Sequence, residues 1–282
     1  MQKLGRAQFV VSGKSGQIGS GQRPSGEKGA GIEFVDHRPY EPGDDLRYLD
    51  VIQYSRRREF MIRQYVVERA LPITILLDAT ESMDYGTPSK FEYARTLCEA
   101  LAFIGLAGGD VVQLATWQGG QLNWSQRVQG RGGAERLFTW LEQAQCSGGA
   151  FDRALPQLRQ LLDKNGLLIV VSDWWDGAAL EATLRLRARQ HVLAVQTLSP
   201  DELEPSFDAH ATLRLVDSES GQEVDLTVDA DALDSYRDAV AQWRQDMQQS
   251  FVRAGARLAT LRTDEPIEQA LLIGWRRSRL IA

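Results

Sequence analysis

The chain has 282 residues, of which 43% are hydrophobic and 25% charged, and its net charge is −6. These values are typical of a globular protein with one large α/β domain and additions, and the acidic balance excludes the basic footprint of a nucleic-acid binder. Two cysteines are too few for a disulfide framework. The first residues lack the apolar core of a secretory signal, and no apolar run is long enough to cross a bilayer. We therefore expect a cytoplasmic protein without a membrane span.

The chain opens with two segments of different composition. Residues 1–30 become rich in glycine and serine, which predicts a flexible lead-in. Residues 31–70, called the arm below, contain the tight-turn sequence Pro42-Gly43-Asp44-Asp45 and a strand-like run at 60–68. We expect the arm to contain strands and to precede a larger domain.

The arm carries a mixture of arginines and carboxylates. The side chains concerned are Arg38, Arg47, Arg56, Glu33, Asp44, Asp45 and Asp50. One interpretation is an ion-pair network that holds the arm to the following domain. The other interpretation is a charged docking surface for a partner, and the sequence leaves both open.

Strands and helices alternate from residue 71 to residue 282. The apolar runs 73–77, 111–117, 167–173 and 191–198 predict strands, and stripes at helical spacing between them predict helices. Such alternation implies a doubly wound, mostly parallel sheet and thus an α/β fold. Residues 211–228 break the rhythm, because alternating apolar positions flank a Ser-Gly turn, and we expect an inserted β-hairpin there.

Oxygen-bearing side chains follow two of the predicted strands. Asp78, Thr80 and Ser82 come directly after the run 73–77, and Asp173 closes the run 167–173. Neighbouring parallel strands end at the same edge of a sheet, which is where ligands bind in open α/β folds. Because Mg²⁺ and Mn²⁺ prefer oxygen ligands, these four residues predict a divalent-metal site. The competing interpretation is helix N-capping, which favours the same residue types.

Trp174 and Trp175 follow Asp173 immediately. They are either buried under a neighbouring helix or exposed beside the cation as aromatic anchors, and we favour partner binding. An enzymatic alternative is a Mg²⁺-dependent phosphohydrolase with a strand-end aspartate as nucleophile. Such an enzyme needs a second aspartate two residues later as acid and base, where Thr80 stands, so no catalytic residue is assigned.

Two stretches resemble known families. Residues 76–82 resemble the metal-ion-dependent adhesion site (MIDAS) of von Willebrand factor A domains. The sequence GIEFVDHRPYEPGDDLRYLD at 31–50, followed by SRRREFMIRQYVVE, is similar to the signature of the family called domain of unknown function 58 (DUF58), a resemblance that runs from about residue 31 to the end. The signature positions within the arm are Arg38, Tyr40, Gly43, Asp44, Asp45, Arg47, Asp50 and Arg56.

The resemblance implies a fold, a site and a role. The implied fold is von Willebrand factor A-like, and the implied metal site consists of Asp78, Thr80, Ser82 and Asp173. The implied role is that of a non-enzymatic interaction module, an adaptor of a MoxR-type AAA+ ATPase and a client protein in chaperone-like assembly. Ala150 stands where the family usually has a threonine ligand, so a metal-free structural scaffold is the alternative.

Overall fold

The computed structural model describes residues 4–10, 24–29, 33–68, 70–163, 166–187, 190–205, 212–216, 223–227 and 229–282. The chain divides into two compact units. One unit is Ser12–Leu71, and the other, called the main domain below, combines Met1–Val11 with Pro72–Ala282. Each unit is described separately.

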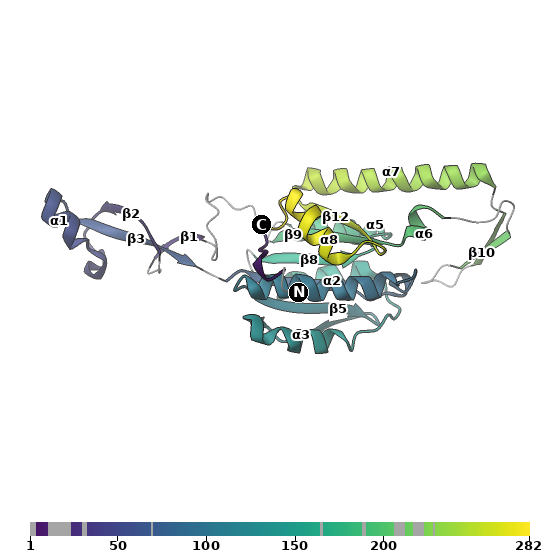
Figure 1. Cartoon of the computed structure of the whole chain (residues 1–282), viewed down its shortest axis with the longest axis horizontal. Helices are drawn as coiled ribbons and strands as arrows, with labels where there is room; N and C mark the ends of the chain where they lie inside the picture. The colour runs from purple at the N-terminus through teal and green to yellow at the C-terminus, as the bar shows by residue number, and fades with distance from the viewer. Residues whose placement is uncertain are drawn as a thin grey trace. The chain divides into compact units, whose positions relative to one another are not determined.

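The smaller unit contains a three-stranded antiparallel sheet (Figure 1). Its strands are β1 (Pro24–Gly29), β2 (Glu33–Pro39) and β3 (Met61–Glu68), in the spatial order β1-β3-β2. Helix α1 (Val51–Arg57) lies between β2 and β3 in the chain and was not predicted. It begins at Asp50, whose carboxylate accepts hydrogen bonds from two backbone N–H groups of the first turn. This N-cap explains why so short a segment is helical.

The central sheet of the main domain has the strand order β12-β9-β8-β4-β5-β6, and β7 also pairs with β5. Every pair from β12 to β5 is parallel, whereas β6 and β7 run antiparallel to β5. The prediction of a mostly parallel sheet is confirmed, although the two short antiparallel strands were not predicted. The strands are β4 (Pro72–Asp78), β5 (Val111–Gln118), β6 (Gln121–Trp124), β7 (Val128–Gln129), β8 (Leu167–Ser172), β9 (His191–Leu198) and β12 (Arg257–Arg262).

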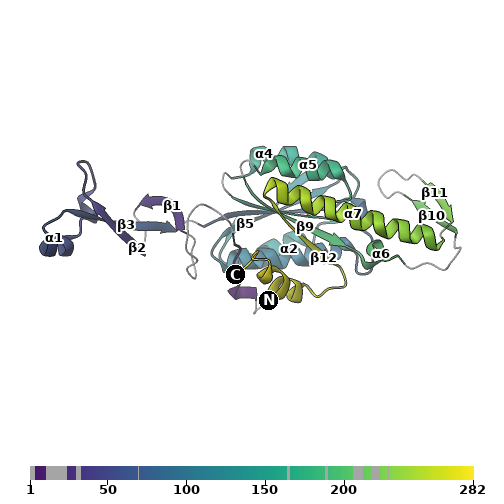
Figure 2. The same cartoon turned by 90° about the horizontal axis from the view of Figure 1, so that it is seen from above.

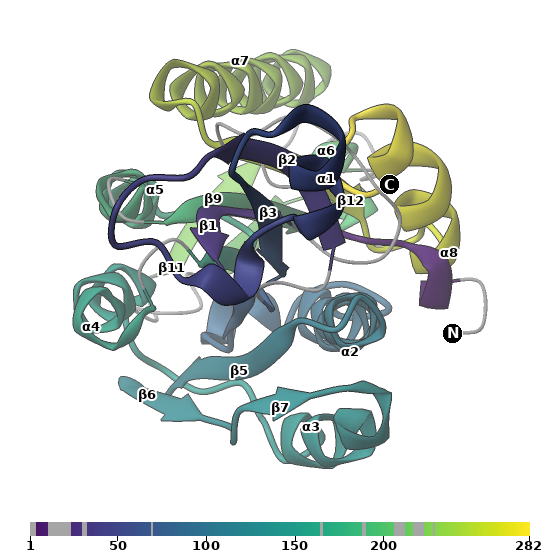
Figure 3. The same cartoon turned by 90° about the vertical axis from the view of Figure 1, so that its left-hand side faces the viewer.

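Helices cover both faces of this sheet. They are α2 (Lys90–Ala107), α3 (Ala134–Leu141), α4 (Ala154–Leu161), α5 (Gly177–Leu186), α6 (Pro200–Leu203), α7 (Ala230–Ala254) and α8 (Ile267–Gln269), the last continued by a π-helical turn, Ala270–Trp275. Figure 3 shows α4 and α5 on one side of the sheet and α2 and α8 on the other. Figure 2 shows α7 alongside α5. The doubly wound arrangement implied by the resemblance is thus confirmed.

Strand β4 lies in the middle of the core and has apolar neighbours on both faces. Ile73 points toward α2, where a Cβ added at Gly105 would meet its side chain. Leu76 points the other way and packs in a buried cluster with Phe151 and Leu155. Because both faces are covered, the strand is apolar up to Asp78 except for Thr74, which is also buried.

The described part of the predicted lead-in differs from the expectation of flexibility. Residues 1–3, 11–23 and 30 lie outside the described residues. Leu4, Ala7 and Phe9 are buried in the main domain. Phe9 forms a β-bridge with Ile281, so the first described residues pair with the end of the chain. These apolar side chains, rather than the glycines that follow, decide the conformation of residues 4–10.

The predicted hairpin region contains two antiparallel strands, β10 (Thr212–Val216) and β11 (Glu223–Thr227). Leu213 lies opposite Leu226, and Leu215 lies opposite Val224. The Ser-Gly turn that motivated the prediction lies outside the described residues. No helix within the described ranges is long and apolar enough to span a membrane.

Candidate functional site

The candidate site lies where β4 and β8 end side by side. The chain passes from β4 to β5 on one side and later returns to β8 on the other, which makes the β4–β8 boundary a topological switch point. In this parallel pair, Leu77 lies opposite Val171. The register therefore brings Asp78 next to Ser172 and leaves Asp173 one residue beyond the strand. We call this end of the sheet the carboxyl edge.

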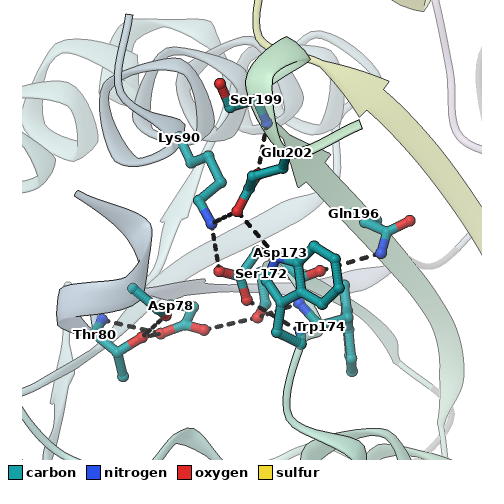
Figure 4. Close-up of polar contacts among 11 residues, drawn as sticks. Asp78, Thr80, Lys90, Ser172, Asp173, Trp174, Gln196, Ser199 and Glu202 are labelled. Atoms are coloured by element: carbon teal, nitrogen blue, oxygen red, sulfur yellow. Dashed lines mark hydrogen bonds and ion pairs between the residues drawn. The ribbon is translucent and has the colours of Figure 1, made fainter. Parts of the chain in front are cut away.

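Asp78 is buried, with 2% of its surface exposed, and both its oxygens accept hydrogen bonds (Figure 4). Its Oδ2 accepts from the Ser172 hydroxyl at 2.7 Å. Its Oδ1 accepts from the backbone N–H and the hydroxyl of Thr80, at 3.0 and 2.8 Å. Burial, and next the charge of Asp173, raise the pKa of Asp78 to about 7, and the hydrogen bonds from Ser172 and Thr80 oppose this shift only in part.

Asp173 is paired with a lysine that sequence reasoning missed. Lys90 begins α2 and is 1% exposed. Its Nζ donates to Asp173 Oδ2 at 2.7 Å and to Glu202 Oε1 at 2.5 Å (Figure 4). Burial alone would lower the pKa of Lys90, but the charges and hydrogen bonds of the two carboxylates outweigh it and raise this pKa, so the ammonium stays charged. We call Asp173, Lys90 and Glu202 the ion chain.

Glu202 connects the ion chain to the surface. Its Oε2 accepts from the backbone N–H of Ser199 at 2.8 Å, and its Oε1 accepts from the Trp175 indole N–H at 3.0 Å as well as from Lys90. Its backbone carbonyl accepts from the Tyr236 hydroxyl at 2.8 Å. A carboxylate with this many donors is fixed in position.

The structure brings the four predicted metal ligands to one edge. Asp78, Thr80 and Ser82 form a hydrogen-bonded series, with 3.1 Å between the Thr80 and Ser82 hydroxyl oxygens. Thr80 precedes the 3-10 turn Glu81–Met83 but makes no side-chain cap hydrogen bond, so capping does not account for it. The residues are together, as the sequence predicts.

This donor set nevertheless does not fit a divalent cation. Asp173 already binds the Lys90 ammonium, and Ala150 offers no side-chain oxygen. Two unit charges 4 Å apart interact by about 4 kcal/mol at an effective dielectric constant of 20. A divalent cation at that distance from the Lys90 ammonium would therefore be repelled by about twice that energy.

Trp174 is a core residue, so its assignment to partner binding is wrong. It is 1% exposed, and its indole N–H donates to the Val195 carbonyl at 3.0 Å. Its ring packs edge-on against Phe151 and Phe251, with centroids 6.5 and 5.6 Å away. The competing interpretation, burial under a neighbouring helix, is the correct one for Trp174.

Trp175 points outward and is 37% exposed. Its ring stacks on Trp243 of α7, with a centroid distance of 4.0 Å and an interplanar angle of 4°. Tyr85 and Tyr236 are also exposed. Partial burial raises the pKa of both, and nearby carboxylates raise it further, Asp201 and then Glu202 for Tyr85 and Glu202 for Tyr236. We call Tyr85, Trp175, Tyr236 and Trp243 the aromatic surface.

The predicted ion pairs of the arm form within the arm. Arg38 makes a two-pronged pair with Asp44, at 2.6 and 2.5 Å, which lowers the pKa of that carboxyl. Arg47 pairs with Asp45, two residues away, and the Arg47 side chain is 82% exposed. Both pairs join residues that are close in sequence and lie within the smaller unit.

Asp50 is a buried charge among the described residues of the arm. Besides capping α1, it accepts from His37 Nε2 at 2.7 Å and from Arg63 Nε at 3.1 Å. The backbone hydrogen bond from Gln53 in the cap, followed by those from His37 and Arg63, holds the pKa of Asp50 well below its usual range.

The remaining signature positions are structural or exposed. Gly43 has φ = 106°, which a turn residue with a Cβ adopts only under strain. The rings of Tyr40 and Phe60 meet edge to face at 6.4 Å. Arg56 is exposed in the last turn of α1, where a positive charge suits the helix dipole.

Sequence reasoning missed Lys90 and Glu202. One feature of the sequence could have indicated a role for Lys90: a lysine in the first turn of a helix is disfavoured by the helix dipole unless an acidic partner is close. Glu202 lies three residues after Ser199, a spacing that indicates a helix start but not a partner 112 residues away in the chain.

Comparisons with known proteins place the chain in a family. It is 29% identical over 246 residues to "Uncharacterized protein Rv1480" of Mycobacterium tuberculosis, covering 84% of this chain and 76% of that protein. A solved structure of an aerotolerance-related membrane protein from Bacteroides fragilis matches with a TM-score of 0.46 and 16% identity, covering 71% of this chain and 94% of that one. The SpRpn10 VWA domain matches with a TM-score of 0.41 and 11% identity, covering 72% and 94%.

Both TM-scores lie below 0.5, so neither structural likeness bears on function. The family model described as "Protein of unknown function DUF58" matches residues 36–247, well over half of the chain. The match includes most of the arm, the strand ends that carry Asp78 and Asp173, and the ion chain. The chain belongs to the DUF58 family.

Proposed function

We propose that this chain is a non-enzymatic protein-interaction module that binds its partner at the carboxyl edge, through the aromatic surface. The observation that carries the proposal is Trp175, a large aromatic side chain that is exposed and yet fixed in place. Aromatic side chains of this kind supply much of the binding energy at protein interfaces.

The aromatic surface is organised before a partner arrives. Trp175 is held on one face by Trp243 and at its indole N–H by Glu202. Tyr236 is held by its hydroxyl to the backbone of Glu202. Because these rings are already ordered, their side chains lose less conformational entropy when a partner binds.

The charge of the surrounding loops indicates the chemistry of the partner. These are the segments 79–89, 145–153, 173–176 and 199–205, the last of which includes α6, and their exposed basic residue is Arg153. The exposed acidic residues of these segments are Glu81, Asp84, Asp176, Asp201 and Glu204. A partner surface rich in lysine and arginine therefore complements this edge, and the association of such a partner weakens as salt is added.

The family resemblance suggests who the partner is. We assign the role of adaptor to this chain, between a MoxR-type AAA+ ATPase and a client protein in chaperone-like assembly. The burial of Asp78 speaks against the phosphohydrolase alternative, because both oxygens of that would-be nucleophile are hydrogen-bonded within the protein.

The test is a binding titration of the full chain with the MoxR-type ATPase of the same organism. Trp175→Ala should weaken binding by about 30-fold, the equivalent of a ~2 kcal/mol hot spot. Trp140→Ala is the matched control, because Trp140 is a partly exposed tryptophan on α3, outside the aromatic surface. Equal binding by the parent and Trp175→Ala would place the interface elsewhere. A parent that does not bind the ATPase would leave the metal-free scaffold as the better description.

A further inference from the structure

The buried lysine of the ion chain has no counterpart in the metal site that the sequence predicts. Lys90 is almost fully buried at the first position of α2, where the helix dipole disfavours a cation. An ammonium in such a place is stable only when carboxylates surround it. Asp173 and Glu202, which lie 83 and 112 residues further along the chain, supply that environment.

The Lys90 ammonium lies at the carboxylate where the sequence predicts a metal ion. Asp173 is the second strand-end carboxylate, the one expected to bind a divalent cation together with Asp78. Its Oδ2 instead lies 2.7 Å from Lys90 Nζ, and Glu202 contributes a second carboxylate oxygen at 2.5 Å (Figure 4). A positive charge is therefore present at this carboxylate, and the chain itself provides it.

We propose that the Lys90 ammonium is the resident cation of the carboxyl edge and takes the place of a divalent metal. The inference deepens the proposed function, because it concerns the same edge, but it is tested without a partner.

Asp78, the other strand-end carboxylate, also has its hydrogen bonds supplied by the chain itself. Both oxygens of Asp78 accept hydrogen bonds, from Ser172 and from Thr80. Ala150, at the sequence position of the threonine ligand that the resemblance implies, has no side-chain oxygen to offer a metal. Asp78 and Asp173, the two strand-end carboxylates, thus each have partners within the protein.

The resident cation also has a consequence at the surface. Lys90 and the Trp175 indole N–H donate to the same oxygen of Glu202. Lys90 therefore acts as a positioning residue, because it holds the carboxylate that orients the aromatic surface. Partner binding should be unaffected by EDTA and sensitive to substitution of Lys90.

The experiment is thermal unfolding and calorimetric titration of the full chain, after EDTA treatment, with millimolar Mg²⁺ or Mn²⁺. The parent should give no binding heat and no shift in Tm. Lys90→Met keeps an unbranched apolar stem without the charge, so it should lower the Tm and create a stabilising response to Mg²⁺. Binding heat together with a raised Tm in the parent would overturn the proposal, as would a parental Tm for Lys90→Met.

Two further variants keep the test decisive if Lys90→Met does not fold. Ala150→Thr restores the hydroxyl of the usual ligand and should remain insensitive to Mg²⁺ while Lys90 is present. A metal response in Ala150→Thr would show that the ammonium does not exclude the ion. Lys90→Arg keeps the charge and should retain both the fold and the insensitivity. Failure of partner capture would leave these results unchanged, so the two proposals fail separately.

Discussion

Two groups of charged residues in this chain form ion pairs of similar length but differ in burial and in sequence separation. The arm pairs Arg47 with Asp45, two residues away, in a bridge whose arginine is almost fully exposed. The carboxyl edge of the main sheet pairs Lys90 with Asp173 and Glu202 across more than eighty residues, in a buried site. Both are short ion pairs, yet solvent screens only the first.

The difference shows that burial, more than the length of an ion pair, decides its consequence. Each charge of an exposed pair is well hydrated without its partner, so loss of the pair changes the free energy of unfolding little. In a buried group of charges, removing one member leaves the others without solvent and without a partner. The carboxyl edge should therefore tolerate substitution far less than the arm.

The largest effect is expected when the ion chain loses a carboxylate. Asp173→Ala leaves the buried Lys90 ammonium with Glu202 alone. Removal of one partner from a buried ion pair typically costs ~3–5 kcal/mol in the free energy of unfolding. Urea denaturation should show this loss as a lower midpoint at unchanged slope. A midpoint equal to that of the parent would mean that the ion chain is not formed in solution.

A smaller and local effect is expected at Asp50, a buried charge of the arm. Asp50→Ala removes the N-cap of α1 and the contacts to His37 and Arg63. Amide hydrogen exchange should become faster across Val51–Arg57, because the first turn loses its acceptor. Exchange in the strands of the main domain serves as the internal control and should not change. Uniform acceleration in both units would contradict a local role.

A pH-dependent effect is expected at Asp78. Its pKa is raised from 3.8 to about 7 in the folded protein, so folding favours the protonated carboxyl. That contribution is complete below the unfolded value and is lost as pH rises through the folded one. Asp78→Asn stays neutral, so its Tm relative to the parent should rise between about pH 4 and about pH 7. A Tm difference that is constant across this range would place the pKa of Asp78 near its ordinary value.

The smallest effect is expected at Arg47. Arg47→Ala removes an exposed pair with Asp45 and should leave the unfolding midpoint unchanged within error. A clear loss of stability would show that Arg47 has an interaction beyond its neighbour. Unchanged stability together with weaker partner binding would revive the docking interpretation of the arm.

The sequence predicts the features that depend on local pattern. The apolar strands, their parallel pairing and the approach of Asp78 to Asp173 all follow from periodicity and from the rule that parallel strands end at one edge. Trp174 and Trp175 show the limit of such reasoning. They are adjacent and identical, yet one is buried against Phe251 and the other stacks on Trp243, and only tertiary packing distinguishes them.

Long-range polar contacts are the part that could not be predicted. The pairing of Lys90 with Glu202 depends on where α6 lies relative to α2, which no local pattern encodes. The ion chain also bears on the interpretation of the metal motif, because the residues of the motif are present but Asp173 is paired with the Lys90 ammonium. Residue types thus predict which side chains meet at the edge, and we propose that its cation is the Lys90 ammonium rather than a metal.

The most direct test is a pair of double-mutant cycles on unfolding free energy. One cycle combines Lys90→Met with Asp173→Ala, and the other combines Arg47→Ala with Asp45→Ala. For the buried pair we predict that the double variant costs less than the two single variants together, with a coupling energy on the order of 2 kcal/mol. For the exposed pair we predict no measurable coupling. Additive losses at Lys90 and Asp173 would contradict a resident ammonium at the carboxyl edge.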